Sequence, residues 1–350
     1  MSARQQVFVS LTILGLAGAG AAWRQRAPAG RPSGSAAGAD LSARAGGESR
    51  QPIAFTRAAF GVSGALRIRE VLTGEIFGMP LRGRVRGAGA VAYRWLPVQG
   101  TPGLPTPWWP LRAAGQVGAP ARQGVYLMQV RLPGEDVTLE DLQVVVEVPF
   151  ERVRAGYLGA YHVGQYPVDQ RRRYAWPVGF IEVTPANEEL PLSEHLRLRQ
   201  FLTHDQAGAW PKYAVVDTRL LDKLELVLAE LERMGVPAHR LYVMSGYRTP
   251  QYNRRGLGHG RAVLSRHQYG DAADVWVDDD GDGYMDDLNG DGRRDIRDAA
   301  VMLRAVARVE GAHPELVGGA GTYSATARHG PFVHIDARGR RARWGGAAGE

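Results

Sequence analysis

The stretch that decides the fold of this chain is Ser265-Arg-His-Gln-Tyr-Gly-Asp-Ala-Ala-Asp274, which has the form S-x-H-x-x-G-x-A-x-D. Its histidine, His267, and its last aspartate, Asp274, can converge on one cation if the chain turns at the small residues between them. Gly270 permits the unusual backbone of such a turn, and Ala272 leaves room for close packing. Neutral imidazole and carboxylate suit zinc, which needs a third protein ligand and an open fourth position for catalysis.

The third ligand is expected in Phe332-Val-His-Ile-Asp336, a short run that predicts a β-strand. On a strand, His334 and Asp336 point to the same side, because they are two residues apart. His334 is therefore the candidate ligand, and Asp336 can orient it or another group of the site. His329, in the pattern H-x-x-x-x-H with His334, is either a general base or charge-stabilising group near the metal, or an ordinary loop histidine.

A further candidate follows the apolar run Leu241-Tyr-Val-Met-Ser245, which predicts a buried strand. The strand leads into the loop Ser245-Gly-Tyr-Arg-Thr-Pro, a place where functional side chains are often presented. The guanidinium of Arg248 can bind a carboxylate through two hydrogen bonds. Taken alone, Arg248 could equally be a surface arginine.

These three elements together resemble the M15-type zinc D-Ala-D-Ala peptidases, which share their fold with hedgehog signalling domains. The similarity covers roughly residues 192–338. The resemblance implies an α+β, hedgehog/DD-peptidase-like catalytic domain with one catalytic zinc ion. It assigns roles as follows: zinc ligands His267, Asp274 and His334, substrate contact Arg248, and a catalytic position for His329.

The general base stays open within this resemblance. Other members of the family place an acidic residue a few positions before the last ligand histidine, whereas Pro331-Phe-Val333 fills that stretch here. His329 would then have to serve. We expect Arg248, together with Ser265, to anchor a carboxylate of the substrate.

An acidic segment, residues 278–298, follows the metal motif directly and contains two overlapping calcium-loop frames. The first frame offers Asp278, Asp280, Asp282 and Asp286. The second offers Asp287, Asn289, Asp291, Asp295 and Asp298, and has aspartate in place of the usual final glutamate. The sequence therefore predicts a structural Ca²⁺ ion, the alternative being a solvated acidic turn that caps a helix.

Composition limits the partners of the chain. Among its 350 residues there is no cysteine, which excludes disulfides and thiolate metal sites, and the formal net charge is +7. A net positive charge favours binding to an anionic polymer, such as those of the cell envelope. We expect no nucleic-acid partner, because the arginines are scattered and form no patch. The oligomeric state cannot be predicted.

The N-terminus predicts export to the periplasm or cell envelope. Residues 1–23 carry Arg4, an apolar run and the possible cleavage site Ala19-Gly-Ala21. They are either a cleaved signal peptide or an uncleaved anchor that tethers the protein to the membrane. Residues 24–50 are rich in Ala, Gly, Ser, Pro and Arg, which predicts a flexible linker.

Three segments follow the linker. Residues 51–150 alternate apolar and polar positions between Gly and Pro turns, which predicts a small all-β domain of unknown role. In it, Trp108 and Trp109 are either a ligand platform or packing residues. Residues 151–175 read as a connection, and residues 176–345 as the peptidase domain. A helix is expected from Thr218 to Met234, capped by Asp217.

The predicted activity is hydrolysis of amide bonds in the stem peptides or crosslinks of peptidoglycan. A D-Ala-D-Ala carboxypeptidase and a murein endopeptidase both fit the sequence. A different class of protein is the alternative: a non-catalytic, calcium-dependent envelope-binding or scaffold protein with a degenerate peptidase site.

Overall fold

The computed structural model describes residues 9–10, 52–85, 91–112, 115–170, 174–258, 260–327 and 329–346. The expected signal or anchor segment and the linker therefore lie outside the described residues, apart from the two-residue strand β1 (Val9–Ser10). Within the described ranges, no helix is long and apolar enough to cross a membrane.

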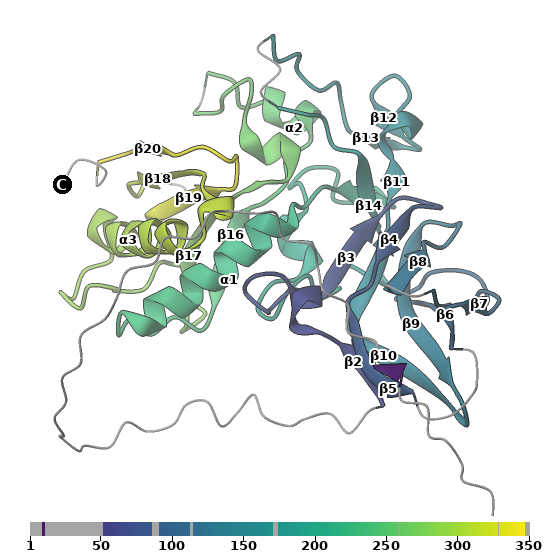
Figure 1. Ribbon diagram of the computed structural model, residues 1–350. Coiled ribbons are helices and arrows are strands. Elements are labelled where there is room, and N and C mark those ends of the chain that lie inside the picture. Colours follow the sequence, from purple (N-terminus) through teal and green to yellow (C-terminus); the bar gives the residue numbers. More distant parts are fainter. Residues whose placement is uncertain are drawn as a thin grey trace, which may run out of the picture.

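The N-terminal half is built of strands, as its alternating pattern predicts, and the described residues 52–149 contain no α-helix (Figure 1). Its largest sheet has the order β3-β10-β9-β6-β7, and two smaller sheets have the orders β1-β5-β2 and β4-β8. The bounds are β2 Ile53–Phe55, β3 Ile68–Val71, β4 Ile76–Gly78, β5 Leu81–Val85, β6 Ala92–Val98, β7 Trp109–Pro110, β8 Gln116–Gly118, β9 Gly124–Leu132 and β10 Glu135–Val146, with a 3₁₀ turn at Arg57–Phe60.

The two neighbouring tryptophans of this half have packing roles. The ring of Trp109 meets that of Tyr93 edge to face, with 5.6 Å between centroids. Two guanidinium groups lie over the ring of Trp108, those of Arg94 at 4.5 Å and Arg131 at 3.8 Å. Both tryptophans are half-buried, so these contacts favour the packing interpretation over the ligand platform.

The segment expected to be a mere connection contributes to the core of the C-terminal half. Leu158, Tyr161, Val163 and Tyr166 are buried in the same apolar cluster as the helices of that half. Short strands order this region, in the sheets β11-β14-β15 and β12-β13. Their bounds are β11 Val148–Pro149, β12 Tyr157–Leu158, β13 Tyr161–His162, β14 Gly179–Val183 and β15 Lys212–Ala214, with a 3₁₀ turn at Phe150–Arg152.

The C-terminal half combines helices with a five-stranded sheet of order β16-β17-β19-β18-β20. The strands are β16 Leu241–Ser245, β17 Ala272–Val277, β18 Gly319–Tyr323, β19 Phe332–Asp336 and β20 Ala342–Trp344. The helices are α1 Thr218–Arg233, α2 Pro250–Arg254 and α3 Ile296–Ala312, with 3₁₀ turns at Leu198–Phe201, Arg266–Tyr269 and Pro314–Leu316. The fold is therefore mixed α and β, as expected.

Helix α1 confirms the sequence prediction closely. The Asp217 carboxylate accepts a hydrogen bond from the backbone N–H of Arg219 at 2.8 Å, which caps the helix. The apolar face of α1 is buried, and α1 packs against α3, as Figure 1 shows. Helix α3 in turn contacts β18 and β19.

The alternation of side chains along β19 separates core from site. Val333 and Ile335 are completely buried in the apolar cluster that includes α1 and α3. His334 lies between them and points to the opposite side of the sheet, because successive strand residues alternate. The helices therefore cover one face of the sheet and leave the other face for polar groups.

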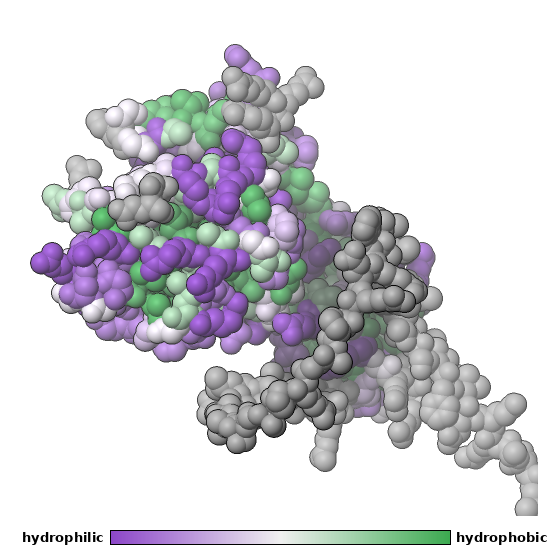
Figure 2. All heavy atoms as spheres, turned by 60° about the vertical axis from the view of Figure 1, so that its left-hand side comes forward, coloured by the Kyte–Doolittle hydropathy of each residue, from purple (hydrophilic) through white to green (hydrophobic). Residues whose placement is uncertain are grey.

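Much of the outer surface of this half is hydrophilic. In Figure 2, hydrophilic residues cover large parts of the face that is turned forward, and the apolar residues between them form separate patches. The large apolar side chains of the sheet and helices are mostly inside.

Candidate metal centre

The candidate ligands are aligned by the register of the sheet. Asp274 of β17 is the direct antiparallel partner of His334 of β19, and Ser245 of β16 is the partner of Asp274 on its other side. Residues that are paired in this way present their side chains on the same face of a sheet. Asp274 and His334 are therefore neighbours as a direct result of strand pairing.

His267 reaches the same face from the 3₁₀ turn just before β17. This turn ends at Gly270, which has a left-handed φ of 73°. A Cβ at this position would lie only 2.5 Å from the carbonyl oxygen of Val215, so both backbone conformation and space require glycine. The expected role of Gly270 in returning the chain toward Asp274 is thereby explained.

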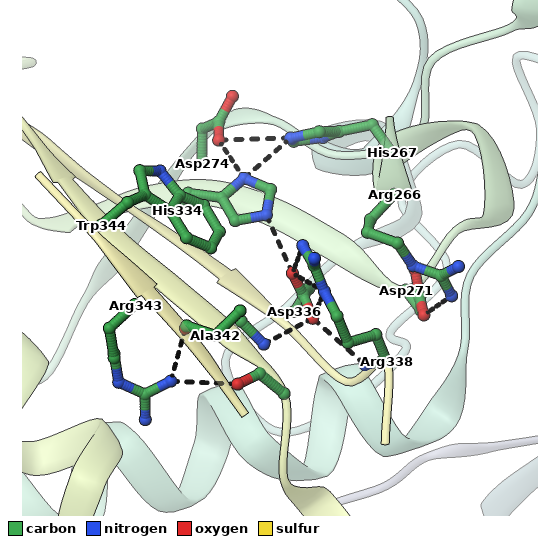
Figure 3. Close-up of polar contacts among 12 residues, drawn as sticks. Arg266, His267, Asp271, Asp274, His334, Asp336, Arg338, Ala342, Arg343 and Trp344 are labelled. Carbon is green, nitrogen blue, oxygen red and sulfur yellow. Dashed lines mark hydrogen bonds and ion pairs between the residues drawn. The ribbon is translucent and has the colours of Figure 1, made fainter. Parts of the chain in front are cut away.

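Three potential ligand atoms converge at one point, as Figure 3 shows. His267 Nε2 lies 3.2 Å from Asp274 Oδ1 and 3.2 Å from His334 Nδ1, and His334 Nδ1 lies 2.9 Å from Asp274 Oδ1. A tetrahedral zinc ion with bonds of about 2.0–2.1 Å separates its ligands by about 3.3 Å. The three distances fit a zinc ion without rearrangement of the ligands.

Hydrogen bonds on the outer ring nitrogens set the tautomers of both histidines. His267 Nδ1 donates to the carbonyl of Gly246 at 2.7 Å, and His334 Nε2 donates to Asp336 Oδ2 at 3.2 Å. Each inner nitrogen is then left with a lone pair in the neutral ring. Two lone pairs and a carboxylate oxygen that face one another repel unless a cation or proton lies between them.

Burial and neighbouring charges shift the pKa values of the three candidate ligands in different directions. Burial lowers the pKa of His267 to about 4, which keeps its imidazole neutral. Burial alone would raise the pKa of Asp274, but His267, His334 and Arg248 outweigh it and hold this pKa well below the usual range. Burial likewise opposes protonation of His334, yet hydrogen bonds to Asp274 and Asp336 raise its pKa overall. The site attracts positive charge to its centre.

Asp336 contacts the outer ring nitrogen of His334. It is fully buried, and its Oδ1 accepts hydrogen bonds from Gly319 N at 2.7 Å and from Arg338 Nε at 2.8 Å. Arg338 also pairs with Oδ2, the atom that His334 contacts. The hydrogen bonds and charges of His334 and Arg338 keep the pKa of Asp336 far below its ordinary value despite burial. A charged carboxylate behind a ligand histidine increases the basicity of that ligand.

Arg248 lies at the edge of the metal centre. Its Nε donates to Ser245 Oγ at 2.8 Å, and its Nη2 pairs with Asp274 Oδ2. Asp274 therefore uses one oxygen for the two histidines and the other for Arg248. Ser265, the other expected substrate contact, is half-buried, and none of its side-chain hydrogen bonds reaches the ligands within the described residues.

His329 lies on the segment before β19. Its Nδ1 is 2.8 Å from the carbonyl oxygen of Gly330, and its ring meets Phe332 edge to face at 5.0 Å. Among the described residues, no hydrogen bond or ion pair joins His329 to the three ligands. Its assignment as catalytic base stays a prediction.

The structure adds residues that sequence reasoning missed. Trp344 lies beside His334, with ring centroids 5.3 Å apart, and its Nε1 donates to the Tyr323 hydroxyl at 2.8 Å. Gly321 is paired with both His334 and Trp344, and a Cβ there would lie 2.2 Å from Trp344 Nε1. In the sequence, the only trace of the packing of Trp344 on His334 is the glycine at position 321. The packing itself depends on strand pairing, which the sequence does not reveal.

The acidic segment brings together three carboxylates of its first frame. Ligand atoms of Asp278, Asp280 and Asp286 lie within 4.8 Å of one another, while Asp282 pairs with Arg294. No three carboxylates of the second frame converge in this way among the described residues. In the second frame, Asp287 accepts the N–H groups of Gly290, Asp291 and Gly292, and Asp298 accepts those of Leu288, Asn289 and Asp295.

The second frame of the acidic segment is therefore a set of turns and a helix cap. Asp295 and Asp298 form a capping box at the start of α3. Asn289 and Asp291 each accept a backbone N–H two residues ahead, that of Asp291 and of Arg293 respectively. The prediction that the second frame binds Ca²⁺ stays a prediction.

Comparison with known proteins adds a family. Residues 196–287 match the family model described as Peptidase M15. The match includes Arg248, His267 and Asp274 and ends before His334, which joins them through the pairing of β17 and β19. No curated protein and no solved structure gives a significant match. Residues 196–287 of the C-terminal half are therefore similar to M15 peptidases.

Proposed function

We propose that the protein is a zinc-dependent peptidase that hydrolyses amide bonds in the peptide part of peptidoglycan. The observation that carries the proposal is the convergence of His267 Nε2, Asp274 Oδ1 and His334 Nδ1 at separations of 2.9–3.2 Å. Two neutral imidazoles and one carboxylate leave a fourth zinc position open, the arrangement of catalytic rather than structural zinc sites.

When bound, zinc supplies Lewis-acid activation of water and of the scissile carbonyl. His329 assists proton transfer. Its Nδ1 donates to the Gly330 carbonyl, which leaves Nε2 free to accept a proton. His329 is only half-buried, so burial does not close its ring off from proton transfer.

Arg248 has two tasks in this proposal. Nη2 holds Asp274 and Nε contacts Ser245, whereas Nη1 makes no hydrogen bond within the described residues. Nη1 is thus available for a carboxylate of the wall peptide, which Ser265 helps to anchor. An arginine that is already fixed by two partners loses little conformational entropy when it binds substrate.

We place the catalytic domain in the hedgehog/DD-peptidase fold class. The five-stranded antiparallel-rich sheet backed by α1 and α3, with the ligands on β17, β19 and the turn before β17, supports this placement. The proposed compartment is the cell envelope or periplasm. Its support comes from the apolar N-terminal sequence, the linker and the net charge of +7, which suits an anionic polymer.

The bond that is cleaved distinguishes two activities of one site. A D-Ala-D-Ala carboxypeptidase releases free D-Ala from the end of a stem peptide, and a murein endopeptidase converts crosslinked dimers to monomers. Docking of the β half on a polymeric wall would favour the endopeptidase.

Digestion of purified peptidoglycan tests the proposal. The zinc-loaded protein is incubated with and without a chelator, and the released muropeptides and D-Ala are identified by mass. We expect chelator-sensitive products, with dimers converted to monomers. Intact muropeptides after incubation with zinc-loaded protein on several wall chemistries would contradict the peptidoglycan assignment. They would also favour the alternative of a non-catalytic envelope protein.

A further inference from the structure

The loop after β17 contains a buried carboxylate that is only partly satisfied. Asp278 follows the last residue of β17 and is only 1% exposed. Its Oδ1 accepts a long hydrogen bond of 3.3 Å from Gly283 N, whereas its Oδ2 is buried without any hydrogen-bond partner. A buried, unpaired carboxylate oxygen is costly and requires either a proton or a cation.

Two other carboxylates approach the same point. Ligand atoms of Asp280 and Asp286 lie within 4.8 Å of each other and of the Asp278 carboxylate. Burial, followed by the negative charges of Asp280 and Asp279, raises the pKa of Asp286. The cluster therefore lacks positive charge at its centre.

Arg294 does not fill this centre. It pairs with Asp280 Oδ2 at 3.0 Å and with Asp282, and its side chain is 42% exposed. No hydrogen bond or ion pair links Arg294 to Asp278 or Asp286 within the described residues. Arg294 thus neutralises the outer side of the loop and leaves the buried oxygen of Asp278 unmatched.

We propose that Asp278, Asp280 and Asp286 form a site for a hard divalent cation, Ca²⁺, separate from the catalytic metal centre. Carboxylate oxygens suit Ca²⁺ or Mg²⁺, and the flexible geometry and larger ligand number of Ca²⁺ suit an exposed loop with glycines. Gly281 and Gly283 take left-handed φ values of 75° and 85°, which fold the three carboxylates toward one another. Backbone carbonyls and water complete the coordination.

The position of this cation site links it to the catalytic half. Tyr284 is one of the residues of this loop, and its backbone N–H donates a hydrogen bond to Asp282 Oδ1 at 2.9 Å. Its ring lies against Gly330, because a Cβ added at Gly330 would be 3.5 Å from Tyr284 Cδ1. Gly330 directly follows His329 and accepts its hydrogen bond.

Cation binding therefore fixes the tyrosine that supports the His329 segment. At the other end, Asp278 anchors the loop to β17, the strand that carries Asp274. The loop that holds the cation site therefore contacts the rest of the catalytic half at two points, through Tyr284 and through Asp278. The consequence for catalysis rests on the proposed peptidase function, whereas cation binding itself does not.

Cation binding is tested first, on zinc-free full-length protein. Calorimetric titration with Ca²⁺ and thermal melting are compared for wild type, Asp278→Asn, Asp280→Asn and the control Asp291→Asn. Asp291 belongs to the same acidic segment, and its substitution removes the same charge, but it lies outside the cluster of Asp278, Asp280 and Asp286. We expect Ca²⁺ to bind and to raise the melting temperature of wild type and Asp291→Asn by several degrees.

Both cluster variants should lose most of this response. Asp280→Asn guards against misfolding, since Asp280 is exposed while Asp278 is buried. No heat of binding and no change in melting temperature for wild type would overturn the site. So would binding by Asp278→Asn and Asp280→Asn with wild-type affinity. Stronger binding of Mg²⁺ than of Ca²⁺ would overturn the choice of ion.

The link to His329 is tested by NMR of histidine side chains, again without zinc. Ca²⁺ should shift the His329 resonances in wild type but not in Tyr284→Ala, which should still bind Ca²⁺. Unchanged His329 resonances in wild type would overturn the link while leaving the cation site intact. Failure of the peptidoglycan digestion would overturn only the proposed function, because neither readout here depends on activity.

Discussion

His267 Nε2 lies 3.2 Å from His334 Nδ1, although the two residues are far apart in sequence and come from a turn and a strand. Each ring donates its other nitrogen outward, to the Gly246 carbonyl and to the Asp336 carboxylate. Two unprotonated nitrogens at this distance are stable only around a cation or a shared proton. The outer hydrogen bonds therefore prepare the site for a metal.

Substitution of Asp336 tests this preparation. Asp336→Asn removes the negative charge behind His334 but keeps the size of the side chain. We expect zinc affinity to fall by about 10–100-fold, because partners of ligand histidines orient them and increase their basicity. Competition with a fluorescent zinc chelator measures the affinity.

The matched control for Asp336→Asn is Asp222→Asn, another buried aspartate. Asp222 accepts hydrogen bonds from Val62 N and Ser63 N, away from the metal centre. This control should lose stability but keep its zinc affinity. Equal losses of zinc affinity in both variants would show that Asp336 acts only through general stability.

Arg248 is expected to serve both metal ligand and substrate. Arg248→Gln loses the pair with Asp274 and the free Nη1 group, so zinc affinity should fall by less than about tenfold and kcat/KM by at least about a hundredfold. The control Arg255→Gln removes an arginine whose side chain is 60% exposed and should change neither quantity. A variant that loses zinc affinity and kcat/KM by the same factor would contradict a separate role in substrate binding.

The buried pair of Lys223 and Glu310 stabilises the layer behind the site. Lys223 Nζ donates to Glu310 Oε1 and to the Asp336 carbonyl, both at 2.7 Å, and the two side chains are 0% and 2% exposed. Lys223→Met removes the buried cation at Glu310 Oε1 and leaves Glu310 with Arg343, the more distant Arg341 and the Gly318 N–H. We expect a loss of about 3 kcal/mol in the free energy of unfolding. Urea denaturation measures it, and a loss below about 0.5 kcal/mol would contradict the importance of the pair.

Glu147 should make stability depend on pH. Burial, with a smaller contribution from the charge of Glu75, raises the pKa of Glu147 to about 7. The folded state then holds the proton more tightly than the unfolded chain. This contribution is fully present below the ordinary carboxyl pKa of about 4.3 and is lost as pH rises through 7.

Glu147→Gln removes that dependence. At pH 8 the variant should unfold with a free energy up to about 3 kcal/mol higher than wild type, and at pH 5 the two should be similar. Denaturation curves at both pH values check this. The opposite result would be a variant that matches wild type at pH 5 but is less stable than wild type at pH 8. It would mean that Glu147 is charged and paired.

Much of the centre could be predicted from sequence because its ligands lie in local patterns. His267 and Asp274 flank one glycine turn, and His334 and Asp336 obey the alternation of a strand. Helix α1 was likewise predictable from its cap and periodicity. These features depend on neighbouring residues alone.

Other features depend on tertiary contacts and could not be predicted. The hydrogen bond from His267 reaches a backbone carbonyl at Gly246, which no residue type reveals. Trp344 reaches His334 only through the pairing of β18 with β20. In the acidic segment, both frames have calcium spacing, but among the described residues only Asp278, Asp280 and Asp286 bring three carboxylates together, and this convergence is visible only in three dimensions.

Zinc content is the measurement that tests the metal centre most directly. Wild type, His334→Ala and His239→Ala are loaded with zinc, dialysed and analysed by elemental mass spectrometry; His239 is a suitable control because its side chain is 73% exposed and pairs only with Glu232 among the described residues. We predict about one zinc ion per chain in wild type and His239→Ala, and none in His334→Ala together with loss of peptidase activity. A His334→Ala protein that retains zinc and activity would contradict the assignment of His267, Asp274 and His334 as the catalytic metal centre.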